Sequence, residues 1–588
     1  MVRLRSHSIR LLKTPVPTGT PMITVMITNI VAIDLDSLLF LITANLYLTA
    51  QLVDHTYSLS PVLAVSEKRP KDALHWPSWV TYWWLSIALG RRRRGRDDME
   101  LIARLADKRL LQHQGYIDGA WIDAADGARF AVDDPATGKQ IGQVADMGKV
   151  DTHRAIAAAE AAWPAWRKLT AKERAAILRK WFDLMMAAQR DLGIIMTAEQ
   201  GKPLPEAMGE VAYGASFVEW FAEEGKRAYG DVIPHHQDGK RILVTKQPIG
   251  VVAAVTPWNF PHAMITRKCA PALAAGCPVV IKPAPATPYS ALALAVLAER
   301  AGIPKGIFNV VVSNRAAEVG LEMSTNPTVR KLGFTGSTAV GKLLMQQAAS
   351  TVKKVSLELG GNAPLIIFDD ADLERAVEGA IACKYRNAGQ TCVCTNRIFV
   401  QDGIYDTFAE RFAAAVAALK QGNGFDDGID IGPMITSAAV DKVESHIADA
   451  VANGAQVIAG GQRANHGALF FQPTILTNAT PAMKIFREET FGPVAPLFRF
   501  SDEAAVVAMA NDTEYGLAAY FYARDLGRVW RVAEALEYGM VAVNEGILST
   551  EVAPFGGMKE SGIGREGSKY GLDEFMEIKY ILMGGLNS

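Results

Sequence analysis

The sequence predicts an α/β protein organised around a mainly parallel β-sheet covered by helices. Two observations support this prediction. From Gly250 onward, short apolar stretches at residues 251–256, 278–282 and 308–312 alternate with helical stretches such as residues 290–301. Polar and glycine-rich segments directly follow the apolar stretches, as expected where buried parallel strands end. Ligands of such sheets bind at the carboxyl ends of the strands, so we expect the functional residues there.

The composition is that of an ordinary globular protein of several domains, with 588 residues, 49% of them hydrophobic and 21% charged. Lys plus Arg (61) nearly equals Asp plus Glu (62), which argues against binding nucleic acid through bulk charge. The five cysteines are irregularly spaced, which argues against a disulfide scaffold and favours a reducing compartment. No Cys/His cluster has zinc-ligand spacing. We therefore expect a cytoplasmic protein without a structural metal.

Residues 1–98 differ from the rest of the chain, being first basic and then strongly apolar. The apolar stretch at residues 22–53 contains Asp34 and Asp36. Each carboxylate near a membrane midplane costs about 2.5–3.5 kcal/mol, so a single clean span is doubtful. Three interpretations remain: an upstream untranslated region, a targeting or membrane-associating extension, and an extra domain. Membrane association is expected only if this extension belongs to the mature protein, and Met99 is a plausible start.

Before the sheet begins, the sequence predicts a hairpin and several helices. Residues 116–122 hold an Asp-Gly pair, which favours a tight hairpin turn. Alanine-rich helices follow Asp151 and the capping box formed by Thr170 and Glu173. Gly201 ends a third helix.

Residues 241–247 form an alternating strand outside any βα unit. Such a strand has unpaired edges, so we expect it to form an arm or edge that pairs with another subunit.

Two strand ends carry candidate binding groups in the first half of the sheet. The loop after the strand at residues 251–256 places Asn259 between aromatic residues. A buried asparagine usually satisfies backbone groups, but its amide can also donate to a developing oxyanion. Lys282 follows the next apolar stretch, where it either extends to solvent or binds a phosphate or ribose.

A glycine loop within residues 332–341 follows an expected strand and leads into an apolar helix. We expect Gly336 to allow a tight turn and Ser337 or Thr338 to cap the helix. The N–H groups of that helix would favour a diphosphate. The loop lacks the full glycine pattern of dinucleotide-binding proteins. The prediction of diphosphate binding therefore rests on its position between a strand and a helix.

Two acidic positions follow later strands. Glu358 ends an apolar stretch, where it is either salt-bridged or a base whose pKa is raised by desolvation. Glu489 precedes Phe491, and we expect the carboxylate to hold ribose hydroxyls while the ring packs on a flat heterocycle. The alternative is a turn with an ordinary surface acid.

The segment at residues 386–394 presents Cys392 from a glycine-containing loop, with Arg386 six residues upstream. A cysteine there is either a small buried hydrophobe or a nucleophile, if its surroundings stabilise the thiolate.

In this order, these motifs resemble the aldehyde dehydrogenase superfamily over the chain from about Met99 to the C-terminus. Residues 386–394, 551–557 and 564–571 are similar to the succinate-semialdehyde dehydrogenase branch. The resemblance implies a Rossmann-type nucleotide-binding domain, an α/β catalytic domain and a small β oligomerisation arm.

The domain limits implied by this resemblance begin after the atypical extension at residues 1–98. They give a nucleotide-binding domain at 99–357, interrupted by an arm at 230–247, a catalytic domain at 358–560 and an oligomerisation tail at 561–588. Homodimers or homotetramers are implied.

The resemblance also implies a mechanism. The Cys392 thiolate attacks an aldehyde, the Asn259 side chain and the Cys392 backbone N–H hold the oxyanion, and hydride leaves to a nicotinamide. Glu358 then activates the water that hydrolyses the thioester. The substrate implied is succinate semialdehyde, in 4-aminobutyrate degradation; the runner-up is glutarate semialdehyde or another ω-carboxylated aldehyde.

By the same resemblance, the distal carboxylate of the substrate is held by Arg267, Arg386 and Ser549. An internal salt bridge at one of the arginines is the alternative. The residues expected to contact the cofactor are Thr256, Pro257, Trp258, Lys282, Pro283, Ala284, Pro285, Gly336, Ser337, Gly341, Leu359, Glu489 and Phe491.

The chain departs from the family pattern at Pro285, where NAD-preferring members often have a glutamate. Without a carboxylate there is less repulsion of a 2′-phosphate, and Lys282 could pair with it. We therefore expect NADP, with NAD as the alternative.

Cys394 adds a redox hypothesis. If its segment is extended, Cys392 and Cys394 face the same side and could oxidise together; a structural cysteine is the alternative. Two other protein classes also stay open. One is a thiol hydrolase or acyltransferase that uses Cys392 and Glu358 without redox chemistry. The other is a membrane-tethered structural protein that kept the fold without turnover.

Overall fold

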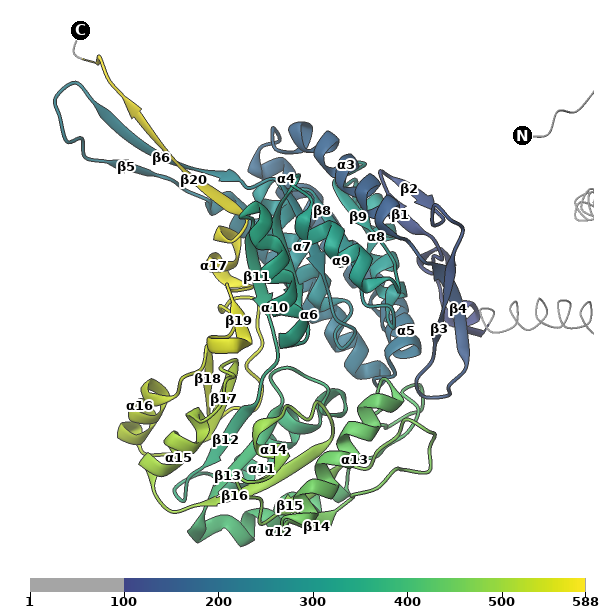
Figure 1. Ribbon diagram of the computed structural model, residues 1–588, viewed down its shortest axis with the longest axis vertical. Helices are drawn as coiled ribbons and strands as arrows, with labels where there is room; N and C mark the ends of the chain where they lie inside the picture. Colours follow the sequence, from purple (N-terminus) through teal and green to yellow (C-terminus); the bar gives the residue numbers. More distant parts are fainter. Residues whose placement is uncertain (1–99, 587–588) are drawn as a thin grey trace, which may run out of the picture. The chain divides into compact units, whose positions relative to one another are not determined.

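The computed structural model describes residues 100–586, and the expectations for residues 1–98 lie outside this range. Its first large sheet has eight strands in the order β19-β11-β10-β7-β8-β9-β1-β2, of which the five from β11 to β9 run parallel (Figure 1). These strands are β1 (Gly115–Ile117), β2 (Ala120–Ile122), β7 (Val251–Val255), β8 (Val279–Lys282), β9 (Phe308–Val310), β10 (Val329–Thr335), β11 (Lys354–Glu358) and β19 (Gly562–Ile563). The predicted hairpin is confirmed as the antiparallel pair β1–β2.

The helices associated with the first sheet are α3 (Lys149–Trp166), α4 (Ala171–Ala187), α5 (Gln189–Gln200), α6 (Leu204–Glu224), α7 (Ala263–Ala275), α8 (Pro288–Ala301), α9 (Ala316–Thr325) and α10 (Thr338–Ala348). The capping box is confirmed, because the Thr170 backbone N–H donates to the Glu173 carboxylate at 2.7 Å. Gly201 follows α5 with a φ of 90°, which stops the helix as expected. The first helix begins at Lys149, slightly earlier than the sequence suggested.

The second large sheet has seven strands in the order β14-β15-β16-β13-β12-β17-β18 within residues 100–586. They are β12 (Ala363–Ile367), β13 (Thr395–Gln401), β14 (Gln456–Ala459), β15 (Thr474–Thr477), β16 (Val494–Phe500), β17 (Ala518–Tyr522) and β18 (Met540–Val543). The accompanying helices are α11 (Leu373–Tyr385), α12 (Tyr405–Ala417), α13 (Ser437–Ala452), α14 (Lys484–Arg487), α15 (Glu503–Asn511) and α16 (Leu526–Ala535). The predicted α/β fold is confirmed.

The chain passes directly from one sheet to the other at the end of β11. Glu358 is the last residue of β11, and β12 begins at Ala363. The chain later returns to the first sheet, where Gly562 of β19 pairs with Glu358. The expected domain division at residues 357 and 560 stays a prediction, and the sheet membership of these strands supports it.

A third sheet forms the expected arm. It has the order β20-β6-β5, with β5 (Asp231–Ile233), β6 (Arg241–Pro248) and β20 (Met576–Met583), and it extends away from the two large sheets (Figure 1). The C-terminal strand β20 pairs antiparallel with β6 over eight residue pairs, so the tail rejoins the arm within the same chain. Helix α17 (Ser568–Asp573) leads into this strand. A separate hairpin joins β3 (Arg129–Asp133) and β4 (Gln140–Ala145).

Within the described residues, no helix combines the length and apolar character needed to cross a membrane.

Candidate active site

A cavity of about 220 Å³ is lined by residues from both large sheets and contains the predicted thiol. Its lining residues are Pro257, Trp258, Asn259, Met264, Thr335, Gly336, Ser337, Leu359, Gly360, Cys392, Glu489 and Phe491. The lining brings together eight residues that the sequence placed on separate motifs for cofactor binding or catalysis, in addition to Cys392. Within residues 100–586, no group of three or more His, Cys, Asp or Glu side chains is arranged to hold a metal ion.

The loop that carries Cys392 has an unusual backbone. Directly after Arg386, Asn387, Ala388 and Gly389 have positive φ values of 52°, 56° and 73°. A left-handed non-glycine residue costs roughly 1–2 kcal/mol, so the surrounding contacts must hold this loop. Only glycine fits at position 389, because the Cβ of any other residue would lie 2.2 Å from the Gly492 carbonyl oxygen.

Cys392 lies in a turn that its neighbours close, because the Cys394 N–H donates to the Thr391 carbonyl at 2.9 Å. Burial raises the pKa of Cys392 to about 12, although Arg267 and Arg386 act in the opposite direction. The resting group is therefore a neutral thiol at physiological pH, and the reaction must generate the thiolate.

The condition for the Cys392–Cys394 hypothesis, an extended segment, is not met. Cys392 and Val393 form a turn, so the alternation of side chains along a strand does not apply here. Cys394 is buried, and its thiol hydrogen-bonds the Lys384 carbonyl at 3.3 Å. Oxidation of the pair stays an untested prediction that this arrangement does not favour.

Asn259 is buried beside the thiol loop. Its Nδ2 donates to the Gln390 carbonyl at 3.1 Å, so the amide hydrogen-bonds the loop of Cys392 directly. The backbone carbonyl of Asn259 accepts from Lys202 and Asn387 at 2.8 and 3.0 Å. The side chain thus satisfies a backbone group and also lines the cavity with Cys392, and its role as an oxyanion donor stays a prediction.

Glu358 is 3% exposed, and its Oε2 has no hydrogen-bond partner within residues 100–586. Burial, together with nearby Glu566, raises the pKa of Glu358 well above its usual value. The surroundings therefore match the predicted desolvated base, and Glu358 makes no ion pair in this part of the chain. An unpaired buried carboxyl oxygen is costly unless it is protonated or has a role.

The glycine loop before α10 differs in detail from the prediction. Gly336 is not left-handed; glycine fits because a Cβ would lie 2.5 Å from the Phe334 ring. Ser337 is the N-cap residue, but its side chain makes no capping hydrogen bond. The Thr338 hydroxyl instead accepts from the Gly360 N–H at 3.3 Å. Gly341 allows Leu359 to pack against α10, because a Cβ would lie 2.4 Å from that side chain.

Glu489 and Phe491 also line the cavity. Glu489 accepts from the Gly361 N–H at 3.1 Å, and burial raises its pKa to about 7. The Phe491 ring meets Trp258 edge to face at 5.7 Å between centroids.

Other predicted cofactor residues lie outside this cavity. Lys282 is buried at the end of β8, where its Nζ donates to the Pro283 carbonyl at 3.2 Å. Burial lowers the pKa of Lys282 to about 8. Pro285 lines a second cavity of about 440 Å³ that also contains Glu199. Thr256 and Ala284 are buried and line neither cavity.

The two predicted arginines have different environments. Arg267 on α7 is 1% exposed and forms an ion pair with Glu566 at 2.7 Å, so the internal salt bridge expected as the alternative is present. Its Nη2 nevertheless has no hydrogen-bond partner within residues 100–586. Arg386 is half-buried and has no ion-pair partner in the same range; its guanidinium carbon lies 5.2 Å from the Phe260 ring centroid.

The sequence argument missed Tyr213 on α6. Its hydroxyl accepts from Arg267 Nη1 at 3.4 Å and hydrogen-bonds Ser549. Burial raises the pKa of Tyr213 above its usual value, while Arg267 and Arg386 lower it. Tyr213 thus connects the residues predicted to bind the substrate carboxylate. An aromatic residue in an amphipathic helix gave no signal that distinguished it from a core position.

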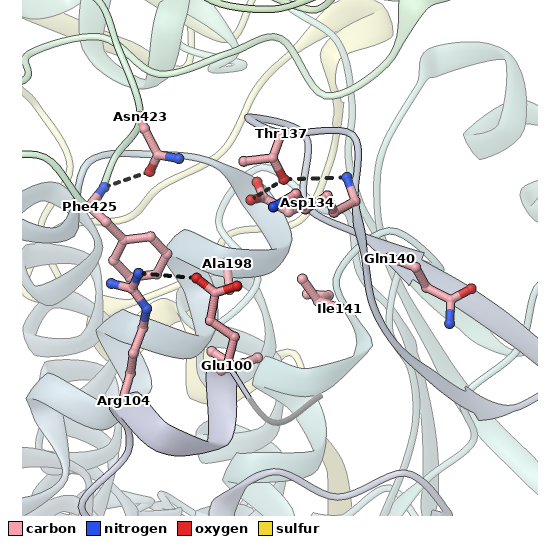
Figure 2. Close-up of a pocket in the computed structure, with 11 residues that line it drawn as sticks. Glu100, Arg104, Asp134, Thr137, Gln140, Ile141, Ala198, Asn423 and Phe425 are labelled. Atoms are coloured by element: carbon pink, nitrogen blue, oxygen red, sulfur yellow. Dashed lines mark hydrogen bonds and ion pairs between the residues drawn. The ribbon is translucent and has the colours of Figure 1, made fainter. Parts of the chain in front are cut away.

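Figure 2 shows another hollow, of about 100 Å³, between Arg104, Asp134 and Phe425. Its polar groups already bond one another: Thr137 donates to Asp134 at 2.8 Å, and the Phe425 N–H donates to Asn423 at 3.0 Å (Figure 2). Arg104 lies over the Phe425 ring at 4.4 Å. Within residues 100–586, the lining of this hollow contains no cysteine, serine or histidine, so we place no chemistry there.

Comparison with known proteins agrees with the site geometry. The model of the aldehyde dehydrogenase family matches residues 121–581. The chain is 63% identical to a glutarate-semialdehyde dehydrogenase of Pseudomonas aeruginosa and 63% identical to the succinate-semialdehyde dehydrogenase [NADP(+)] GabD of Escherichia coli. Each match covers 82% of this chain and 100% of the relative.

A solved succinate-semialdehyde dehydrogenase from Burkholderia pseudomallei superposes with a TM-score of 0.81 at 63% identity, covering 82% of this chain and 99% of that one. Because the family model spans most of the chain and these relatives match it along their full length at 63% identity, the chain belongs to the aldehyde dehydrogenase family.

Proposed function

We propose that this protein oxidises succinate semialdehyde to succinate with NADP⁺. The observation that carries this proposal is the cationic environment beside Cys392. Arg386 has no ion-pair partner within residues 100–586, and the buried Arg267 keeps one N–H₂ group without an acceptor. A relative 63% identical to this chain is named for the same reaction, with the same cofactor.

The electrostatics favour a substrate with a distal anion. Lys268 and Arg267 both pair with Glu566, which leaves this buried group with one positive charge in excess. Arg386 adds another, and burial raises the pKa of Glu358, which disfavours a negative charge on that carboxyl. A buried donor without an acceptor costs roughly 1–3 kcal/mol, so a carboxylate that bonds Arg267 would remove this cost. A short semialdehyde with a terminal carboxylate supplies that acceptor.

Within the site, Cys392 is the nucleophile and Asn259 Nδ2 is the donor to the oxyanion formed from the aldehyde oxygen. The adduct on Cys392 becomes a thioester, and Glu358, once deprotonated, takes a proton from the water that hydrolyses it. The Glu358 carboxyl is buried and free of ion pairs within the described residues, so its basicity is high when it ionises. These roles are proposals that rest on the geometry and the family.

The residues present fit a nicotinamide cofactor. The cavity beside Cys392 is flanked by aromatic rings, and the N-terminus of α10 has backbone N–H groups that no Ser337 side chain caps. Lys282 is a buried amine that donates to a single carbonyl within residues 100–586, so it has donors left for a ribose or a 2′-phosphate. When bound, the nicotinamide supplies the acceptor for the hydride. Pro285 offers no carboxylate against a 2′-phosphate, which supports NADP⁺ over the alternative NAD⁺.

Glutarate semialdehyde is the second candidate, because it has the same distal carboxylate one methylene further away. A relative from Pseudomonas aeruginosa, also 63% identical, is named for that substrate. The two arginines alone do not distinguish succinate semialdehyde from the longer glutarate semialdehyde.

The decisive experiment measures kcat/KM for succinate semialdehyde, glutarate semialdehyde and butanal with NADP⁺ and NAD⁺. We expect succinate semialdehyde to exceed butanal by at least about 100-fold, because one arginine–carboxylate interaction contributes a few kcal/mol. Arg386→Ala should narrow that ratio, whereas Arg411→Ala, which removes an exposed arginine from α12, should not. Equal efficiency for succinate semialdehyde and butanal in the parent enzyme refutes the proposed substrate class. Absence of nucleotide reduction with every aldehyde would instead favour the thiol hydrolase.

We further propose a cytoplasmic homodimer or homotetramer that acts in 4-aminobutyrate degradation. All five cysteines are free thiols, which supports a reducing compartment. The exposed apolar residues of the arm support assembly.

A further inference from the structure

We propose that the buried ion pair between Lys202 and Glu210 is a positioning device that fixes the oxyanion donor Asn259 relative to the Cys392 loop. This inference rests on the proposed catalytic roles of Asn259 and Cys392. Neither Lys202 nor Glu210 touches the cavity, so both act through the residues they hold.

Lys202 lies between α5 and α6, and its side chain is fully buried. Its Nζ is 2.6 Å from Glu210 Oε2 and donates to the Asn259 carbonyl at 2.8 Å. The same ammonium group lies over the Phe260 ring, 4.0 Å from the centroid. One cation therefore fixes two successive residues of the loop that carries the oxyanion donor.

Glu210 holds the other side of that loop. Its Oε1 accepts from the backbone N–H groups of His262 and Ala263 at 2.9 and 3.2 Å. These groups open α7, where unpaired N–H donors need an acceptor. The carboxylate thus anchors the end of the loop while its second oxygen orients Lys202.

The same region also holds the strained loop of the nucleophile. Gln200 Nε2 donates to Asn387 Oδ1 at 2.9 Å, and Asn387 Nδ2 donates to the Asn259 carbonyl at 3.0 Å. The Lys202 N–H donates to Gln200 Oε1 at 3.0 Å. The carbonyl of Asn259 is therefore the point at which the lysine and the left-handed Asn387 meet.

A purely stabilising role explains this arrangement poorly. Burying two charges costs several kcal/mol per ion before their attraction is counted, and apolar replacements are often as stable. A directional ammonium group, in contrast, fixes positions that an apolar side chain leaves free. Displacements of about 1 Å in an oriented site can cost roughly 100-fold in rate.

The test replaces the whole pair by neutral side chains, in Lys202→Met/Glu210→Gln, because Lys202→Met alone would leave a buried carboxylate unpaired. The amide oxygen of the glutamine introduced at position 210 can still accept from α7. We expect kcat for succinate semialdehyde to fall about 10- to 100-fold, since oxyanion stabilisation acts mainly in the transition state. The Kd for NADP⁺ and the aldehyde KM should change less than about threefold, because ground-state binding is kept.

The matched control is Lys331→Met/Glu574→Gln, which removes another buried lysine pair of 3.1 Å. Lys331 is likewise fully buried and lies 5.0 Å from an aromatic ring centroid, that of Phe575. It contacts neither catalytic loop through any hydrogen bond within residues 100–586. A kcat loss in the control as large as in the test variant, at equal Tm, would overturn the inference.

A cycle with Asn259→Ala separates positioning from general damage. If Lys202 and Glu210 act through Asn259, adding their replacement to Asn259→Ala should lower kcat by less than about threefold further. A full additional loss, or an unchanged kcat in Lys202→Met/Glu210→Gln, refutes the proposal. Failure of the parent enzyme to oxidise succinate semialdehyde would refute the proposed function instead, and the same cycle could then be run with whichever aldehyde is turned over.

Discussion

At the scale of single residues, burial sets the protonation of the reacting groups. The Cys392 thiol and the Glu358 carboxyl both have raised pKa values because water is excluded from them. Arg267 and Arg386 lower the thiol pKa without cancelling this effect. Burial therefore disfavours the charged form of both groups, and the proposed reaction has to generate the thiolate.

Alkylation of Cys392 by iodoacetamide should be slow at pH 7 and should rise about tenfold per pH unit without a plateau up to pH 10. The reason is that only the thiolate reacts, and a pKa of about 12 keeps its fraction small throughout this range. The rate is measured by mass spectrometry of the labelled peptide, with Cys392→Ala as the control for the labelled position. A plateau below pH 9 would show that the thiol is more acidic than its burial implies.

Glu358→Gln should slow steady-state turnover while retaining a pre-steady-state burst of reduced nucleotide, because only thioester hydrolysis needs the base. Stopped-flow absorbance measures both phases. The substitution should also alter the pH dependence of stability. A carboxyl whose folded pKa lies above the unfolded value of 4.5 keeps its proton in the native state, so native stability falls as pH rises above 4.5.

The amide that Glu358→Gln introduces cannot ionise, so the variant lacks this pH-dependent loss of stability. The difference in Tm, variant minus parent, should therefore increase from pH 5 to pH 9. A Tm difference that does not change with pH would contradict the raised pKa of Glu358.

Tyr213→Phe tests the residue that the sequence did not reveal. The Tyr213 oxygen accepts from Arg267, and the same hydroxyl interacts with Ser549, so it lies among the residues proposed to bind the substrate carboxylate. We expect the KM for succinate semialdehyde to rise about 5- to 20-fold, the effect of one charge-assisted hydrogen bond of roughly 1.5 kcal/mol, while butanal kinetics stay unchanged. An equal loss for both aldehydes would mean that the ring packing, and not the hydroxyl, is responsible.

At the scale of secondary-structure elements, the arm shows how segments distant in sequence form one surface. β6 pairs with β20 along its full length, and both lie outside the two large sheets (Figure 1). Ile578 and Tyr580 are two residues apart on β20, so their side chains point to the same face of the strand. They are 73% and 58% exposed. Large apolar side chains exposed side by side on a strand indicate an interface with another copy of the chain.

Ile578→Asp/Tyr580→Asp should therefore lower the mass measured by analytical ultracentrifugation, because charges would have to be buried at the interface. The matched control is Leu526→Asp/Trp530→Asp on α16, where two apolar residues are 70% and 63% exposed. An unchanged mass in the β20 variant would place the interface elsewhere.

At the scale of the whole molecule, function depends on the meeting of two α/β units. β11 ends at Glu358 and β12 begins at Ala363, so the chain crosses between the sheets beside the cavity. Loops from the first sheet bring Asn259 and Gly336, and loops of the second bring Cys392 and Glu489. Residues predicted to bind the cofactor and the proposed nucleophile Cys392 thereby line one cavity.

The sequence by itself determined the α/β class and the positions of several strands and helices along the chain, and it singled out Cys392, Glu358 and Asn259 as candidate reacting groups. Strand-to-helix alternation, the capping box at Thr170 and the position of Cys392 after a glycine loop are local patterns, and local backbone preferences govern them. The arm strand at residues 241–247 was also visible, because its alternation lacked a following helix. The resemblance to the family rested on motifs of the same local kind.

Only the tertiary structure decided the electrostatics of the site and the pairing of its residues. The Arg267 ion pair, the Tyr213 contacts and the hold of Lys202 on Asn259 all join segments far apart in the chain; Glu566 lies 298 residues from Lys268. The turn that separates Cys392 from Cys394 likewise depends on loops packed around it. A pKa depends on the charges and the water that surround a group in space, and the order of residues along the chain does not specify those neighbours.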